Sequence, residues 1–344
     1  MKAVRFHEHG GLEVLRYEDV DVPRPGLGEV LVRVSACALN HLDIWIRNGI
    51  PSYKIPMPHI SGCDVSGWIE EPGEGVSGLD KGLRVVLSPG VSCGTCEWCR
   101  NGNDNLCVDY KIFGAGTQGG YAQYCVVRAV DCIPLPESIG DEAAAAFPLT
   151  FLTAWHMLFT RAQLKFGETL LVMGAGSGIG SAAVQMGLHA GATVIATAGS
   201  DEKVDQARSM GAKHVIHHTR ERPRDRVREF TSGRGADVVF EHIGGEVLIE
   251  ALASLAKNGR VVTCGATSGG TASVDIRFFY MRQHSLLGSM MGNRRELDQI
   301  IPLIASRQLT PVIDRTFPLS QAQVAQRWME ERKNFGKILL LPEG

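Results

Sequence analysis

The sequence predicts an α/β protein in which a doubly wound parallel sheet is joined to a second domain rich in β-strands. Three observations predict this fold. Apolar runs of strand length alternate with helical segments after residue 152, Pro and Gly interrupt the first 152 residues, and four cysteines lie within fifteen residues. The chain has 344 residues, of which 44% are hydrophobic, so it can bury two separate cores.

The first expected domain covers residues 1–152. Its short strand-like runs, such as EVLVRVSACAL and YAQYCVVRAVDCIPL, are separated by the breakers PRPGLGE, EEPGEGVSG and GTQGG. The Ala-rich segment DEAAAAFPLTFLTAWHMLF, which Pro148 interrupts, marks the change to the next domain. Residues 293–344 end in the strand-like runs VIDRTFPL and FGKILLLP, and we expect them to return to the first domain.

The second expected domain covers residues 153–292 and contains the alternating elements. Its strand candidates are TLLVMG, TVIATA, HVIHH, DVVFEHI, RVVTCGA and SLLGSMM. Glycines at positions 191, 211 and 259 follow three helical segments and predict helix ends there. Continuous apolar strands with helical crossovers predict a parallel sheet covered on both faces.

The cysteine cluster has the spacing C-x2-C-x2-C-x7-C and lies in a lobe over residues 91–110. Four thiolates about 2.3 Å from one Zn²⁺ complete a tetrahedron and leave no position for a substrate, so the predicted zinc is structural. The nine cysteines are odd in number and no apolar leader opens the chain, which favours a reducing, cytoplasmic location over disulfides. The predicted ligands are Cys93, Cys96, Cys99 and Cys107.

A glycine-rich turn, GAGSGIG, follows the first strand of the second domain and opens a helix. Small residues let the backbone approach a diphosphate, and the free N–H groups of the helix start point at the anion. The alternative is a tight turn without a ligand. The predicted cofactor contacts here are Gly174, Ser177, Gly178, Ile179 and Gly180.

The end of the second strand predicts which dinucleotide binds. TVIATAGSDEK has no carboxylate at its strand end to chelate the ribose of NAD, whereas Ser200 and Lys203 could hold a 2′-phosphate. We therefore expect NADP(H), with NAD(H) as the alternative. Asp201 is interpreted as a first-turn residue of the next helix, and Lys203 as a solvated helix lysine if no phosphate binds.

The charge balance predicts a small-molecule substrate rather than a polyanionic partner. The 35 basic residues nearly match the 37 acidic ones, which disfavours nucleic acid, and no apolar stretch approaches the roughly 20 residues that span a bilayer. The histidines of HVIHH either form a metal tract or pack beside the adenosine.

Taken together, these motifs resemble the medium-chain dehydrogenase/reductase superfamily, which contains zinc alcohol dehydrogenases and quinone or enoyl reductases. The likeness includes GCDVSGWIEEPGEGV, GGYAQY, GAGSGIGSAAVQ, GADVVFEHIGG and the closing GKILLL. It implies a GroES-like β domain, a Rossmann domain for NADP(H), and a homodimer or homotetramer. It also implies further cofactor-lining positions at Ile243, Gly244, Gly265, Ala266 and Lys337.

The same resemblance places Asn40, Cys63 and Leu149 at the three positions that hold the catalytic zinc in zinc alcohol dehydrogenases. This set cannot supply three ligands, so no catalytic zinc is expected there. A relocated zinc is the alternative, because further metal-ligating residues should lie near the same site: Cys37, His41, His59 and Asp64.

Asn40 instead matches the pattern N-x-x-D-x-x-x-R-x-G of the metal-free quinone and enoyl reductases, with Asp43, Arg47 and Gly49. We therefore expect NADPH-dependent reduction of activated C=C bonds or quinones, because hydrogen bonds can stabilise a delocalised enolate. An alcohol dehydrogenase with an unusual zinc ligand set and a non-catalytic dinucleotide-binding sensor are the alternatives.

The expected catalytic residues are Asn40, Asp43, Tyr53 and Cys63. Asn40 would donate an N–H to the substrate oxygen, and Tyr53 or Cys63 would donate a proton. Asp43 would order the loop. Each of the three expected donors also has a structural interpretation: Asn40 as a turn residue, Tyr53 as a loop aromatic and Cys63 as a buried small side chain.

Overall fold

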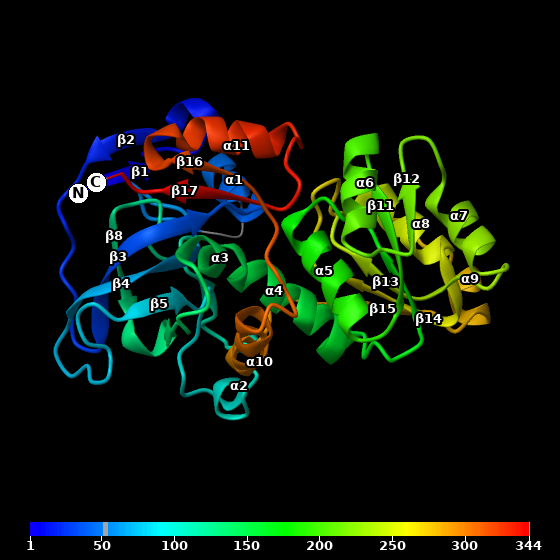
Figure 1. Cartoon of the computed structure of the whole chain (residues 1–344), viewed down its shortest axis with the longest axis horizontal. Coiled ribbons are helices and arrows are strands. Elements are labelled where there is room, and N and C mark those ends of the chain that lie inside the picture. Colours follow the sequence, from blue (N-terminus) through cyan, green and yellow to red (C-terminus); the bar gives the residue numbers. More distant parts are fainter. Residues whose placement is uncertain (51–53, 344) are drawn as a thin grey trace. The chain divides into compact units, whose positions relative to one another are not determined.

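The structure, a computed structural model, describes residues 1–50 and 54–343. The chain divides into two compact units (Figure 1). Unit 1 comprises residues 1–149 and 293–344, and unit 2 comprises residues 150–292. The domain limits predicted at residues 152 and 292 stay predictions.

Unit 1 is built on a seven-stranded sheet with the order β16-β17-β3-β4-β5-β9, in which β8 also pairs with β3. Both strands of the C-terminal tail join this sheet, because β17 pairs antiparallel with β3 and parallel with β16. The tail thus lies in the same sheet as the N-terminal strands. The strands are β3 (Glu29–Ala38), β4 (Asp64–Pro72), β5 (Arg84–Leu87), β8 (Tyr124–Arg128), β9 (Cys132–Pro134), β16 (Ile313–Pro318) and β17 (Lys337–Leu341).

Smaller elements surround this sheet. Two short pairs, β1 with β2 and β6 with β7, are antiparallel. These strands are β1 (Lys2–Arg5), β2 (Arg16–Asp19), β6 (Gly90–Val91) and β7 (Lys111–Ile112). The α-helices are α1 (His41–Asn48), α2 (Glu97–Arg100), α3 (Asp141–Ala146), α10 (Arg294–Ala305) and α11 (Ala322–Glu330), and α4 (Pro148–Trp155) leads into unit 2. Short 3₁₀ turns are η1 (Leu12–Val14), η2 (Asp104–Leu106), η3 (Ala129–Asp131) and η5 (Leu319–Gln321).

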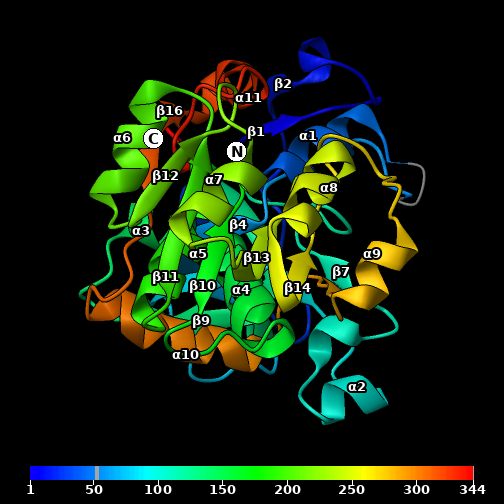
Figure 2. The same ribbon diagram turned by 90° about the vertical axis from the view of Figure 1, so that its right-hand side faces the viewer.

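Unit 2 is a six-stranded parallel sheet with the order β12-β11-β10-β13-β14-β15, and Figure 2 shows this unit from its side. In sequence order this is 3-2-1-4-5-6, the doubly wound order of dinucleotide-binding folds. The strands are β10 (Thr169–Val172), β11 (Thr193–Ala198), β12 (His214–His217), β13 (Ala236–Glu241), β14 (Leu255–Thr263) and β15 (Ser285–Gly288). The predicted α/β fold class is confirmed.

The crossovers of unit 2 are helical. They are α5 (Gly178–His189), α6 (Asp201–Ser209), α7 (Pro223–Phe230), α8 (Gly245–Ala253) and α9 (Ile276–Met281). A π-helical segment, η4 (His156–Arg161), continues from α4. The core of this unit is apolar and includes Leu171, Ile195 and Val261, each 0% exposed.

Two of the three predicted helix ends are confirmed. Gly191 and Gly211 lie just beyond α5 and α6 with φ of +73° and +98°, the left-handed geometry of a C′ glycine. The end predicted at Gly259 is wrong. Helix α8 stops at Ala253, and the chain enters β14 at Leu255, where the pairing with β13 shifts register. The apolar run alone could not separate the last helical turn from the first strand residues.

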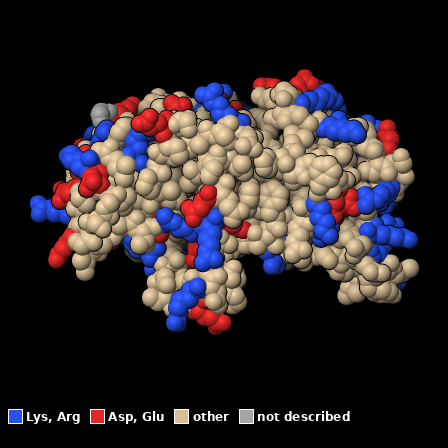
Figure 3. Space-filling model, turned by 60° about the horizontal axis from the view of Figure 1, so that its bottom comes forward, with Lys and Arg blue, Asp and Glu red and all other residues tan. Residues whose placement is uncertain are grey.

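Charged side chains are interspersed on the face drawn in Figure 3, in keeping with the net charge of −2. Among the helices of the described residues, none has both the length and the apolar character needed to cross a membrane.

Candidate active site and cysteine lobe

Asn40 lies between β3 and α1, where its backbone is extended and its position is the N-cap of the helix. Asp43, three residues later, accepts the backbone N–H of Asn40 at 2.7 Å. Its carboxylate also accepts the Tyr121 hydroxyl at 2.9 Å and the backbone N–H of Gly62 at 3.2 Å. Asp43 therefore joins three segments of unit 1, and these contacts suit the ordering role predicted for it.

Burial raises the pKa of the Asp43 carboxyl to about 6, although the hydrogen bonds from Asn40 and Tyr121 act in the opposite direction. The side chain is only 2% exposed. Removal from water disfavours the charged form by more than the donors favour it. Asp43 is thus a carboxylate at neutral pH that becomes neutral in mildly acidic solution.

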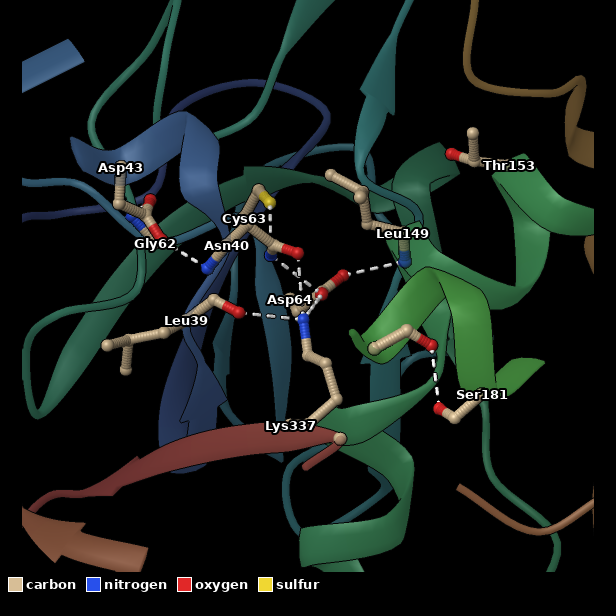
Figure 4. A network of polar contacts seen from close by, with 12 residues as sticks. Leu39, Asn40, Asp43, Gly62, Cys63, Asp64, Leu149, Thr153, Ser181 and Lys337 are labelled. Carbon is tan, nitrogen blue, oxygen red and sulfur yellow. Dashed lines mark hydrogen bonds and ion pairs between the residues drawn. The ribbon is translucent and has the colours of Figure 1, made fainter. Parts of the chain in front are cut away.

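A buried polar network lies beside Asn40 (Figure 4). Its centre is an ion pair in which the ammonium of Lys337 lies 2.9 Å from Oδ2 of Asp64, and the two side chains are 4% and 0% exposed. Lys337 also donates to the backbone oxygen of Leu39 at 2.8 Å and to Oδ1 of Asn40 at 2.8 Å. Oδ1 of Asp64 accepts the backbone N–H of Leu149 at 2.8 Å. All of these groups belong to unit 1.

The three N–H donors of the Lys337 ammonium are all engaged in these contacts. In this arrangement the ammonium has no further N–H to donate to a cofactor, and the cofactor contact expected for Lys337 stays a prediction. Its place is in the buried network, where it neutralises a carboxylate that would otherwise be costly to bury.

The amide of Asn40 has one orientation that satisfies this network. An ammonium can only donate, so the amide oxygen faces Lys337 and the NH₂ group faces Asp64 and Cys63. The NH₂ group donates to Oδ2 of Asp64 at 2.9 Å and to Sγ of Cys63 at 3.3 Å. Both N–H groups of Asn40 are thus engaged within the protein, which differs from the predicted donation to a substrate oxygen.

Cys63 is 1% exposed. Burial, followed by the nearby carboxylates of Asp64 and Asp43, holds the pKa of its thiol well above the ordinary value. The residue is therefore a neutral thiol at physiological pH, with one S–H donor and a sulfur that already accepts from Asn40.

The donor set around Asn40, Cys63 and Leu149 does not suit a catalytic metal. The amide oxygen of Asn40 faces a cation, Leu149 offers only a side chain without donor atoms, and Asp64 is already paired with Lys337. Within residues 1–50 and 54–343, the group of three or more His, Cys, Asp or Glu that could hold a metal is the cysteine lobe.

The residues considered as ligands of a relocated zinc contact other groups of the protein. His59 is 1% exposed, its Nε2 lies 3.0 Å from the backbone oxygen of Gly114, and burial lowers its pKa. Cys37 is buried beside Gly62 and Gly120. The ring of His41 lies 6.4 Å from that of Trp45. Tyr53, the predicted phenol donor, lies outside the described residues.

The cysteine lobe brings its four sulfur atoms within 4.8 Å of one another. Sγ of Cys99 lies 3.9 Å from that of Cys93 and 3.5 Å from that of Cys96. Four thiolates around one Zn²⁺ would be about 3.8 Å apart, so the arrangement fits that ion. Backbone N–H groups also point at sulfur: the N–H of Cys96 lies 3.3 Å from Sγ of Cys93, and that of Cys93 lies 3.2 Å from Sγ of Cys107. Bonds of this kind, from Thr95 and Cys96, lower the pKa of Cys93 to about 6.

The predicted dinucleotide turn joins β10 to α5. Ser177 is the N-cap of α5, where its hydroxyl accepts the backbone N–H of Gly180 and donates to the backbone oxygen of Gly174, both at 2.9 Å. Gly174 has φ of +70°, and a Cβ on Gly180 would lie 2.2 Å from the oxygen of Gly174. The turn therefore requires glycine at both places, and Gly178 and Ile179 open the helix behind it.

The loops after β13 and β14 lie against each other at the same carboxyl edge of the sheet. A Cβ on Gly244 would approach Ala266 Cα at 2.9 Å, and one on Gly265 would approach the His242 oxygen at 2.3 Å. Glu241, fully buried, accepts the backbone N–H groups of Ile243 at 2.5 Å and Gly244 at 2.6 Å.

The residues predicted to lie beside the adenosine half of the cofactor follow the end of β11. β11 ends at Ala198, and Ser200 caps α6 by accepting the backbone N–H of Lys203 at 3.3 Å. Asp201 is the first residue of α6, as predicted, and the Arg220 guanidinium donates to its two carboxylate oxygens at 2.7 and 2.9 Å.

Comparisons with known proteins identify the family of the chain. A family model described as "Alcohol dehydrogenase GroES-like domain" matches residues 26–137, and one described as "Zinc-binding dehydrogenase" matches residues 178–306. The chain is 32% identical to an "NAD-dependent alcohol dehydrogenase" of Sulfolobus acidocaldarius, covering 99% of both chains. It is 31% identical to a "Quinone oxidoreductase" of Rattus norvegicus, covering 99% of this chain and 98% of that one.

A solved structure titled "Crystal Structure of NAD-dependent alcohol dehydrogenase" superposes with a TM-score of 0.95 at 42% identity, covering 99% of both chains. The likeness therefore extends over both units and both terminal segments. The chain belongs to the medium-chain dehydrogenase/reductase superfamily, a superfamily of NAD(P)-dependent oxidoreductases.

Proposed function

We propose that this oxidoreductase reduces activated C=C bonds or quinones with NADPH and uses no catalytic zinc. The observation that carries the proposal is the ion pair between Asp64 and Lys337, which lies beside Asn40 and Cys63, two of the positions to which the family resemblance assigns a catalytic zinc. A buried ammonium already neutralises the Asp64 carboxylate, and Asn40 presents its oxygen to that ammonium.

The chemistry follows from this donor set. NADPH held at the turn between β10 and α5 would supply a hydride for the β-carbon of an enone or for a quinone ring. The substrate's carbonyl oxygen would then take up the displaced π electrons as negative charge. That oxygen then needs a hydrogen-bond donor, and the product needs one proton. Cys63 is a neutral thiol at neutral pH and is our candidate for this donor.

A structural zinc in the cysteine lobe is a second part of the proposal. It is supported by the sulfur spacing and by the N–H groups that point at Cys93 and Cys107. Four thiolates close the coordination sphere, so such an ion would stabilise the lobe and take no part in the reaction.

The preference for NADP(H) is a third part. It is supported by the lack of a carboxylate at the end of β11 and by the engagement of Asp201 with Arg220, which opposes a ribose-binding role for that acid. The named NAD-dependent relatives argue the other way. The ratio of kcat/KM for NADPH and NADH decides between them, and Ser200→Ala should lower only the NADPH value. A cytoplasmic location and a homo-oligomer also stay predictions.

The decisive test combines a zinc count with a substrate panel. The purified protein should carry one zinc per chain and consume NADPH with quinones and enones but not with simple aldehydes. Two zinc ions per chain with turnover of alcohols would instead establish an alcohol dehydrogenase, the activity that the names of two relatives suggest. Cofactor binding without turnover on any substrate would indicate a dinucleotide sensor.

A further inference from the structure

The imidazole of His242 lies against the dinucleotide turn of unit 2. His242 follows β13, and the turn of residues 174–180 follows β10, the neighbouring strand of the sheet. The strand order reverses between β10 and β13, and dinucleotides bind at such a reversal in this fold. Nε2 of His242 lies 3.2 Å from Oγ of Ser177, the N-cap of α5, and 3.3 Å from the position that a Cβ on Gly174 would take. The ring is therefore one side chain away from the helix start where the diphosphate is expected.

The contacts of Ser177 indicate which nitrogen of this ring carries a hydrogen. The hydroxyl donates its single hydrogen to the Gly174 oxygen and accepts the Gly180 N–H, so its third contact is satisfied when Nε2–H of His242 donates to Oγ. A proton added to the ring then goes to Nδ1 and leaves all three contacts unchanged. Protonation of His242 thus requires no rearrangement of the turn.

Few charged or titratable groups surround His242. The Glu241 carboxylate precedes it on β13, and the turn itself has no charged side chain. In the loop after β14, burial and then Glu241 raise the pKa of the Cys264 thiol to about 12, so this thiol is neutral. Burial lowers the pKa of His242, although Glu241 and the backbone oxygens of Met173 and Gly174 favour the charged ring. The ring is thus neutral at neutral pH in the free protein, and a nearby anion would favour its protonation.

We propose that His242 is a further cofactor-binding residue: its imidazole takes up a proton from solvent when a dinucleotide binds at this turn, and the resulting imidazolium attracts the diphosphate. The attraction acts through charge and not through a hydrogen bond from Nε2, since Nε2 already contacts Ser177. The turn presents neutral backbone N–H groups to the diphosphate, and a cation beside them supplies the charge that they lack. This inference goes beyond the proposed reaction and holds for NADPH and NADH alike, because both contain the diphosphate.

NMR can measure the pKa of His242 in the full-length protein with and without ADP-ribose. This probe contains the diphosphate that both cofactors share and has no group that titrates between about pH 5 and pH 8. Protein labelled with ¹³C at the histidine Cε1 gives a signal for each ring, and its loss in His242→Gln identifies His242. We expect ADP-ribose to raise the pKa of His242, with the acid dissociation constant falling about tenfold. The pKa of His214, at the amino end of β12, should not change. An unchanged pKa of His242 would overturn the inference.

The affinity for ADP-ribose provides the second readout, because proton uptake and binding are linked. The affinity of the wild type should rise about tenfold as the pH falls through the pKa of the liganded state, and level off below the pKa of the free state. His242→Gln keeps an N–H donor for Ser177 but cannot become charged, so it should lose this pH dependence. His214→Gln is the matched control and should keep it. If His242→Gln folds poorly, His242→Asn serves as the neutral variant. A pH dependence that persists undiminished in the neutral variant, or a wild type that does not bind ADP-ribose, contradicts the role given to His242.

Discussion

The cysteine lobe and the Asn40 network both gather polar side chains of unit 1 at one place, but they satisfy those side chains differently. The lobe directs four sulfur atoms at one point and backbone N–H groups at two of the sulfurs. In the Asn40 network the ammonium of Lys337 and the amide of Asn40 both find acceptors within the protein, and Oδ2 of Asp64 accepts from both of them. The difference teaches that a buried carboxylate can be balanced by a cationic side chain of the protein, whereas four sulfur atoms directed at one point have no such partner among the contacts described above.

The largest expected effect lies in the lobe. Cys99→Ser should abolish the predicted zinc and with it binding free energy on the order of 10 kcal/mol, because thiolate coordination and folding of the lobe are coupled. Zinc per chain, measured by metal analysis, checks this. Cys264→Ala, in unit 2, is the matched control and should retain the metal. A Cys99→Ser protein that keeps one zinc per chain would contradict the four-cysteine zinc site on which the comparison of the two regions depends.

The next effect concerns the buried ion pair. Lys337→Met should lower the free energy of unfolding by about 3–5 kcal/mol, because it leaves the Asp64 carboxylate buried without a counter-charge. Lys81→Met is the control: its partner is Glu70, but Lys81 is 69% exposed, so the loss should stay below about 1 kcal/mol. Denaturant titration of both variants measures the difference, and equal losses would contradict the role given to burial.

The third effect depends on pH. The folded-state pKa of Asp43 is about 6, above its unfolded value of 3.8, so the folded state binds the proton more tightly. The free energy of unfolding should therefore fall as pH rises from about 4 to about 6, by about 3 kcal/mol for this group. Below about pH 4 both states are protonated, so the contribution of Asp43 to the free energy of unfolding is fully present and no longer changes with pH.

Asp43→Asn isolates that contribution, because the amide does not titrate. The difference in stability between the wild type and this variant should change across pH 4 to 6 and stay constant above pH 7. A difference that is independent of pH would show that burial does not shift the pKa of Asp43 as the geometry implies.

The smallest effect is at the dinucleotide turn. Ser177→Ala removes a helix cap and should cost about 1 kcal/mol. It should also weaken NADPH and NADH binding to a similar extent, since the diphosphate predicted to bind at this turn is common to both cofactors. Ser200→Ala removes the cap of α6 at a similar cost. Calorimetric titration of both variants measures their affinities for NADPH and NADH. Only Ser200→Ala should change the ratio of the two affinities in favour of NADH.

The sequence predicts the parallel sheet, the glycine turn and the cysteine lobe because each depends on residues close together in the chain. The Asn40 network depends on partners far apart: Lys337 follows Asn40 by 297 residues. Its signal was a single lysine in the apolar run GKILLL, since a lysine there needs a buried partner. The amide orientation could not be predicted, because it follows from which atoms meet. Tyr121 and Glu241 were missed for the same reason, although GGYAQY and FEHIGG contain them.

The position of β17 has a consequence for synthesis on the ribosome. This strand lies between β16 and β3, and all of unit 2 is translated after β3 and before β17. The nascent chain can thus complete its nucleotide-binding half while one edge of β3 is still open and Asp64 has no ammonium beside it. The final strand therefore closes the N-terminal sheet and delivers its counter-charge in a single late step.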